Sequence, residues 1–214
     1  PTGNEVVAAR LKVINEFGVD ALRFYLTSSS LMHAENLFFN ERDLRDIYRK
    51  NVTILWNVLK FYELYSKNTI VISNLAARDE KSIIDEEITN NRFLPRSVRS
   101  RNDKINILDK WILARLDQLI KIVTESMNGY DLPRATRPIS EFIDDLSTWY
   151  LRRSRDRFKS ENEAEKNAAL NTTGYVLVEL SKILAPFMPF SAELIWQKVT
   201  GNDFTDLDKS VHLE

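Results

Sequence analysis

Apolar side chains recur at helical spacing along most of this chain, and this periodicity constrains the fold more than any other feature. Residues three and four positions apart share one face of an α-helix, so a sustained series predicts a helix with one buried side. The first stripe comprises Leu44, Ile47, Tyr48, Val52, Leu55, Leu59, Tyr62 and Tyr65. Two further stripes comprise Ile105, Leu108, Trp111, Ile112, Leu116, Leu119, Ile120 and Val123, and Ala135, Ile139, Phe142, Ile143, Leu146, Trp149 and Tyr150. Helices with single apolar faces must pack together, which predicts an all-α, antiparallel helical bundle.

Glycines and capping residues predict where the helices begin and end. Gly18 separates an expected helix over 5–17 from another over 19–28, and Gly129 and Gly201 each follow a helical stretch. Glycine is favoured just past a helix end because it adopts left-handed backbone without steric cost.

Two side chains are expected to cap helix N-termini, and two prolines fall within the helix predicted from the third stripe. Asn40 and Asp131 precede helical stretches and are suitable N-caps. Pro133 lies in a first turn, where its missing N–H costs little. The ring of Pro138 should clash with the carbonyl of Arg134 and kink the helix.

Two more helices are expected toward the C-terminus. The stretch 164–184 is apolar nearly all round at 175–178, which places it at the centre of the bundle. Pro186 and Pro189 separate it from a last helix over 190–199.

The chain divides into three parts on this pattern: a connecting segment, a helical domain with one irregular excursion, and a tail. These parts cover residues 1–40, 41–200 with the excursion at 68–103, and 201–214. No methionine opens the chain, so we interpret it as a segment of a longer polypeptide.

Residue usage argues against an autonomous active site. The chain has no cysteine, only two histidines (His33 and His212) and no glycine-rich phosphate loop. The neighbouring Asp144 and Asp145 point in different directions on a helix and make a poor acid–base pair. We therefore expect neither a catalytic nor a metal site. The absence of a long apolar run and of a signal-peptide pattern predicts a cytoplasmic protein with no membrane partner.

Charge is distributed unevenly although the net charge is only −1. Residues 92–159 hold fifteen Lys and Arg against nine Asp and Glu, whereas the remainder holds fifteen against twenty-two. Two arginine clusters stand out in the basic part: Arg92, Arg96, Arg99 and Arg101 in an aperiodic stretch, and Arg152, Arg153, Arg155 and Arg157 at the end of the third stripe. Such clusters beside aromatic residues predict RNA contact. The alternative is that these arginines pair with acidic residues of neighbouring helices.

Several segments resemble class I aminoacyl-tRNA synthetases. Residues 18–26 (GVDALRFYL) resemble the segment after the KMSKS loop, and residues 108–116 (LDKWILARL) resemble the start of the anticodon-binding domain in the isoleucine, valine and leucine branch. The isoleucyl-tRNA synthetase family in particular is resembled by residues 130–132, 141–150, 152–158 and 210–213. Residues 184–190 with 192–193 resemble a helix junction that is shared across the branch. Two departures are Lys159, where tryptophan is usual, and Pro138 inside a helix that is usually uninterrupted.

This resemblance implies a bundle of the anticodon-binding type that binds tRNA(Ile) and is not itself catalytic. Isoleucine activation, with ATP and Mg²⁺, would belong to a catalytic domain of the same polypeptide, and no cofactor is expected in this chain. Residues 1–40 would be the stem-contact segment that follows the catalytic domain, and residues 201–214 the start of a C-terminal extension. The family also uses further C-terminal segments, so the chain by itself should bind tRNA weakly and in a salt-sensitive manner. Two alternatives remain open: the equivalent valyl or leucyl domain, and a helical interaction scaffold that binds no RNA.

Overall fold

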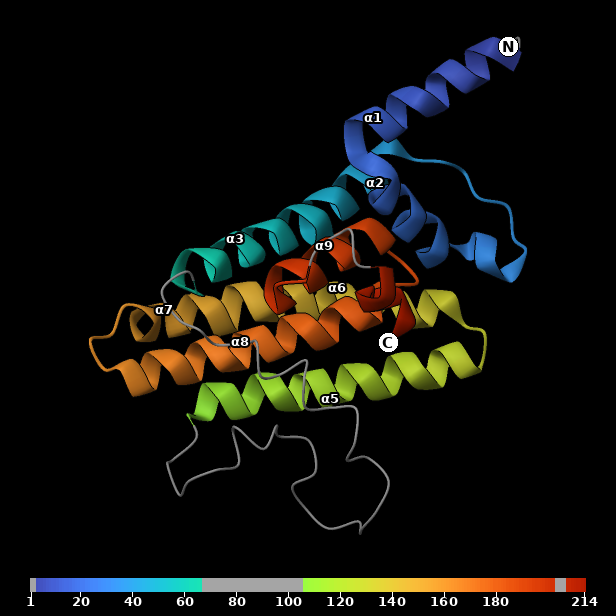
Figure 1. Ribbon diagram of the computed structural model, residues 1–214. Coiled ribbons are helices and arrows are strands. Elements are labelled where there is room, and N and C mark those ends of the chain that lie inside the picture. Colours follow the sequence, from blue (N-terminus) through green and yellow to red (C-terminus); the bar gives the residue numbers. More distant parts are fainter. Residues whose placement is uncertain (1–2, 67–105, 203–206) are drawn as a thin grey trace.

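The computed structural model describes residues 3–66, 106–202 and 207–214, and every regular element in these ranges is helical (Figure 1). The predicted all-α, antiparallel bundle is confirmed for this part of the chain. The excursion at 68–103, with Arg92, Arg96, Arg99 and Arg101, lies outside the described residues.

Four α-helices are long and unbroken by other helical types. They are α1 (Gly3–Ser28), α5 (Ile107–Asn128), α8 (Glu163–Leu184) and α9 (Pro189–Thr200). Short 3₁₀ segments occur at η1 (Ser30–His33), η4 (Leu207–Lys209) and η5 (Val211–Leu213).

Two further helices each change from α to π geometry and back. The first runs through α2 (Glu41–Ile47), η2 (Tyr48–Thr53) and α3 (Ile54–Ser66). The second runs through α6 (Leu132–Asp144), η3 (Asp145–Leu151) and α7 (Arg152–Phe158). A π segment accommodates extra residues without ending the helix. Both stripes predicted from the sequence therefore continue across their π segments.

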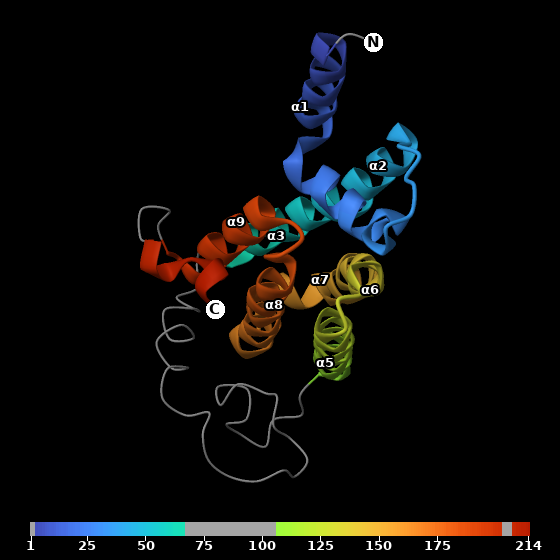
Figure 2. The same cartoon turned by 90° about the vertical axis from the view of Figure 1, so that its right-hand side faces the viewer.

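The bundle has its core between α3, α5, α6–α7 and α8, and α9 packs on α8 (Figure 2). Its largest fully buried side chains include Tyr62, Phe142, Tyr150, Phe158 and Phe187. The expected central position of the helix over 164–184 is confirmed, because α8 contacts α3, α5, α7 and α9.

The expected break at Gly18 is confirmed. Gly18 interrupts α1 with φ 81° and ψ 160°, a backbone conformation that residues other than glycine rarely adopt. A Cβ at this position would meet no atom within 4 Å, so the backbone angle and not crowding requires glycine. The first half of α1, which precedes Gly18, projects away from the bundle (Figure 1).

The predicted caps are also present. Asn40 accepts a hydrogen bond from the Arg42 N–H and Asp131 accepts one from the Arg134 N–H, both at 3.0 Å. Gly201 ends α9 in left-handed backbone.

Pro138 does not interrupt the helix in which it lies. Instead of breaking there, α6 continues to Asp144 and then into η3. The lost hydrogen bond concerns the carbonyl of Arg134, an exposed residue, where water can replace the missing donor.

Candidate nucleic-acid interface

The arginine cluster at the end of the third stripe separates into two groups. Arg152, Arg153 and Arg155 are exposed on α7, whereas the side chain of Arg157 is 9% exposed. Helical geometry explains the division, because Arg157 shares the buried face with Ser154 and Phe158.

Arg157 forms a buried ion pair that connects α7 to α5. Its Nη1 and Nη2 donate to the two carboxylate oxygens of Asp109 at 2.8 and 2.7 Å, and Asp109 is only 3% exposed. The Tyr150 hydroxyl donates to the same carboxylate at 2.8 Å. Two-point geometry of this kind is strong and directional. The guanidinium is therefore held inside the bundle, and the expectation that Arg157 contacts RNA is corrected: it pairs with a neighbouring helix.

Burial and charge act together on this network. Burial by itself would lower the pKa of Arg157, but the hydrogen bonds and negative charge of Asp109 outweigh it and raise the pKa. For Tyr150, burial is the main cause of a raised pKa, and the charge and hydrogen bond of Asp109 raise it further. Both residues therefore keep their protons at neutral pH.

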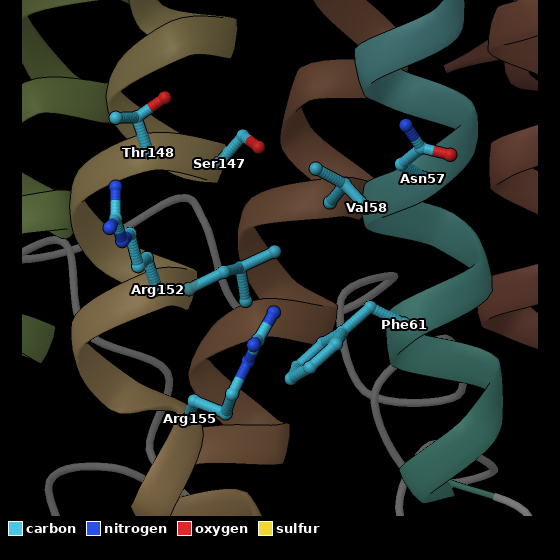
Figure 3. A pocket seen from close by; sticks show the side chains of 8 residues that line it. Asn57, Val58, Phe61, Ser147, Thr148, Arg152 and Arg155 are labelled. Carbon is cyan, nitrogen blue, oxygen red and sulfur yellow. The ribbon is translucent and has the colours of Figure 1, made fainter.

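Arg152 and Arg155 line a groove between α7 and α3. The cavity between the two helices has a volume of about 320 Å³. Figure 3 shows Arg155 of α7 extending toward Phe61 of α3. The lining residues are Asn57, Val58, Phe61, Ser147, Thr148, Leu151, Arg152 and Arg155. No acidic side chain lines the groove, and within the described ranges neither arginine forms an ion pair. The cations are therefore available to an anionic ligand.

The groove also has polar and apolar walls. Phe61 and Val58 of α3 and Leu151 of η3 form apolar surface, while Asn57 and Ser147 supply polar groups. The Thr148 hydroxyl already donates to Asp144 at 2.9 Å. A phosphate beside the arginines and a base or ribose against the apolar wall are both compatible with this lining.

Arg153 lies over an exposed aromatic ring on the neighbouring side of the same helix. Its guanidinium carbon is 4.1 Å from the ring centroid of Trp149, which is 49% exposed, and the Trp111 ring of α5 is 6.5 Å away. Tyr150, the next residue, is fully buried. Of the two adjacent aromatics, only Trp149 can meet a ligand.

Sequence reasoning missed the α3 wall of the groove. Thr148, Arg152 and Arg155 follow the i, i+4, i+7 spacing of one helical face, so this side was readable from the sequence. Asn57 and Phe61 carried no such signal, because only tertiary packing brings α3 to α7.

The remaining candidates from the sequence have simpler surroundings. His33 lies in η1 with its Nε2 3.8 Å from Asp131. Asp145 pairs with Arg115 at 2.7 Å. Among the described residues, no three His, Cys, Asp or Glu side chains gather closely enough to bind a metal ion. The helices of this part also include none with the length and apolarity needed to cross a membrane.

These features define a helical domain with an open basic groove. Comparison with known families shows which class of protein it belongs to. Residues 109–214 match the family described as the anticodon-binding domain of tRNA ligase, and this part of the chain belongs to that family. Among curated proteins, it is similar to enzymes named isoleucine–tRNA ligase.

Three relatives illustrate the extent of this similarity. The chain is 36% identical over 202 residues to the isoleucine–tRNA ligase of Chlamydia trachomatis serovar D. It is 35% identical over 204 residues to those of Clostridium novyi and Treponema denticola. Each match covers 94% of this chain but 17% of the relative, so the chain spans about a sixth of their length.

Proposed function

We propose that this chain is the anticodon-stem-loop-binding domain of an isoleucine–tRNA ligase. In this proposal it holds tRNA(Ile) while a catalytic domain of the same cytoplasmic polypeptide uses ATP and Mg²⁺ to attach isoleucine. Family membership and the three relatives support the assignment. The observation that carries the RNA-binding site is the acid-free groove with two unpaired arginines.

The groove would bind RNA by electrostatics first and by shape second. Arg152 and Arg155 would contact backbone phosphates, since a guanidinium matches the phosphate oxygens in geometry and charge. The wall formed by Phe61 would meet an unpaired base or its ribose, and Trp149 with Arg153 would offer a second stacking surface. RNA contact stays a prediction for Arg92, Arg96, Arg99 and Arg101, which lie outside the described residues.

The test removes both groove cations together. The Arg152→Ala, Arg155→Ala double variant should bind tRNA(Ile) at least ~10-fold more weakly, the loss expected for one charge-assisted hydrogen bond or more. Its log–log dependence of affinity on salt should flatten by about 0.7–0.9 per lost phosphate contact. Fluorescence anisotropy at several salt concentrations measures both quantities.

A matched control separates groove contacts from net charge. Arg42 and Arg49 are exposed on the other long composite helix, and replacing both by alanine changes the charge equally. This control should keep most of the affinity. Equal losses in both double variants, or none in either, would refute the groove as the binding site. A large fall in melting temperature for the groove variant would favour the scaffold alternative.

Specificity for isoleucine is tested separately. Affinities for tRNA(Ile), tRNA(Val) and tRNA(Leu) should rank tRNA(Ile) first. A preference for either of the others would move the assignment to the valyl or leucyl branch.

A further inference from the structure

Asp20, in the half of α1 after Gly18, caps the first turn of α9, whose Phe190 lies 170 residues further along the chain. One carboxylate oxygen accepts the Phe190 N–H at 3.3 Å, and the other accepts the Ser191 N–H and hydroxyl, both at 2.6 Å. The local N-cap of α9, Met188, makes no side-chain capping bond. First-turn N–H groups lack partners within their own helix, and the helix dipole favours an anion there. Asp20 therefore supplies the cap that the local sequence lacks.

Arg23, one turn further along α1, binds the other side of the same corner. Its Nε donates to the Pro186 carbonyl at 2.9 Å, just after α8 ends. A cation is favourable at a helix C-terminus for the same reason that an anion is favourable at an N-terminus. The anionic Asp20 thus binds the N-terminus of α9, and the cationic Arg23 binds the carbonyl just after the C-terminus of α8. We call these two side chains the clamp.

Apolar packing on two adjacent faces of this segment adds to these polar contacts. Phe24 is buried and contacts Phe187 of the corner edge-on, with ring centroids 6.5 Å apart. On an adjacent face of the helix, Tyr25 and Ala21 belong to a second cluster with Phe17. The segment after Gly18 therefore joins the projecting half of α1 to the bundle, as Figure 2 shows.

We propose that Asp20 and Arg23 are positioning residues that fix the angle at which the first half of α1 leaves the bundle. A catalytic domain beyond that helix would be held in constant orientation to the groove of Arg152 and Arg155. This last consequence rests on the proposed function, whereas the clamp itself does not.

The test follows this angle through the distance between two labels in the present chain. The sequence contains no cysteine, so spin labels can be attached at Lys12→Cys on the projecting half of α1 and Lys121→Cys on α5 without background. Asp20→Ala should broaden and shift the distance distribution between the labels. The expected fall in melting temperature is only about 2–4 °C, the effect of one lost cap in a chain of this size.

Three further variants make the result decisive. Asp20→Asn keeps an oxygen acceptor, and asparagine caps helices as well as aspartate does, so it should restore the narrow distribution. Arg23→Gln should broaden the distribution without unfolding, because Arg23 is largely exposed, and it carries the test if Asp20→Ala fails to fold. Asp46→Ala removes an exposed acid of α2 and should change nothing.

The clamp is refuted if Asp20→Ala and Arg23→Gln both leave the distribution unchanged, or if Asp46→Ala broadens it equally. Affinity for tRNA(Ile) in the same variants should stay at the parent value, because the groove lies on other elements. A parent chain with no RNA affinity would contradict the proposed function and leave the distance result unaffected.

Discussion

The two faces of α7 carry the same residue type and use it in different ways. On one face, Arg157 is buried and bound at two points to Asp109. On the other, Arg152 and Arg155 border an open groove and have no ion-pair partner within the described residues. Neighbouring arginines at one helix end can therefore serve stability and ligand binding separately. The orientation of the helix relative to the core decides the role of each residue.

The buried face should be the sensitive one for stability. Asp109→Ala leaves the Arg157 guanidinium without its partner and should lower the free energy of unfolding by about 3–5 kcal/mol. In a chain of this length that corresponds to a fall of roughly 6–20 °C in melting temperature, measurable by circular dichroism.

Two controls sharpen this prediction. Asp156→Ala removes an exposed acid from the same helix and should change stability by no more than about 0.5 kcal/mol. Replacing the pair together, by Asp109→Leu with Arg157→Met, should recover much of the loss, since neither charge is left alone. A mild effect of Asp109→Ala would mean that the two faces do not differ as described.

High pH should also affect the buried residues first. Burial raises the pKa of Tyr62 and Tyr150 above the usual value near 10. The unfolded chain loses these protons at lower pH than the folded one. The associated stability is thus complete below pH 10 and falls above it, by about 1.4 kcal/mol per pH unit for each tyrosine.

Tyr62→Phe isolates one of these contributions. The Tyr62 hydroxyl has no hydrogen-bond partner among the described residues, so the variant should be as stable as the parent at pH 7. Between pH 10 and 11 it should lose less stability than the parent by about 1 kcal/mol. Denaturant titrations at both pH values measure the difference, and equal losses would contradict the raised pKa.

The smallest effect is expected on the exposed side. Arg153→Gln removes a cation from the Trp149 ring and should cost about 0.5–1 kcal/mol of stability at most. Affinity for tRNA(Ile) should fall only a few-fold, because this variant keeps the groove cations. A loss as large as that of the Arg152 and Arg155 double variant would move the centre of the interface from the groove to Trp149.

Much of the local structure could be predicted from the sequence because its causes are local. Apolar residues three and four apart, the Asn40 and Asp131 caps and the break at Gly18 depend on neighbours within one or two helical turns. A spacing of three residues also puts Arg152 and Arg155 on one face of α7. Pro138 lies inside α6 without ending it, because a missing donor beside solvent costs less than one in the interior.

Tertiary structure alone decided which residues meet across the bundle. The burial of Arg157 depends on Asp109, 48 residues away, and the groove depends on α3 lying beside α7. The cap on α9 comes from Asp20 at the other end of the chain. A helical pattern specifies which face of each helix is buried, but not which helix covers it or at what register. Those choices follow from how all the apolar faces pack at once.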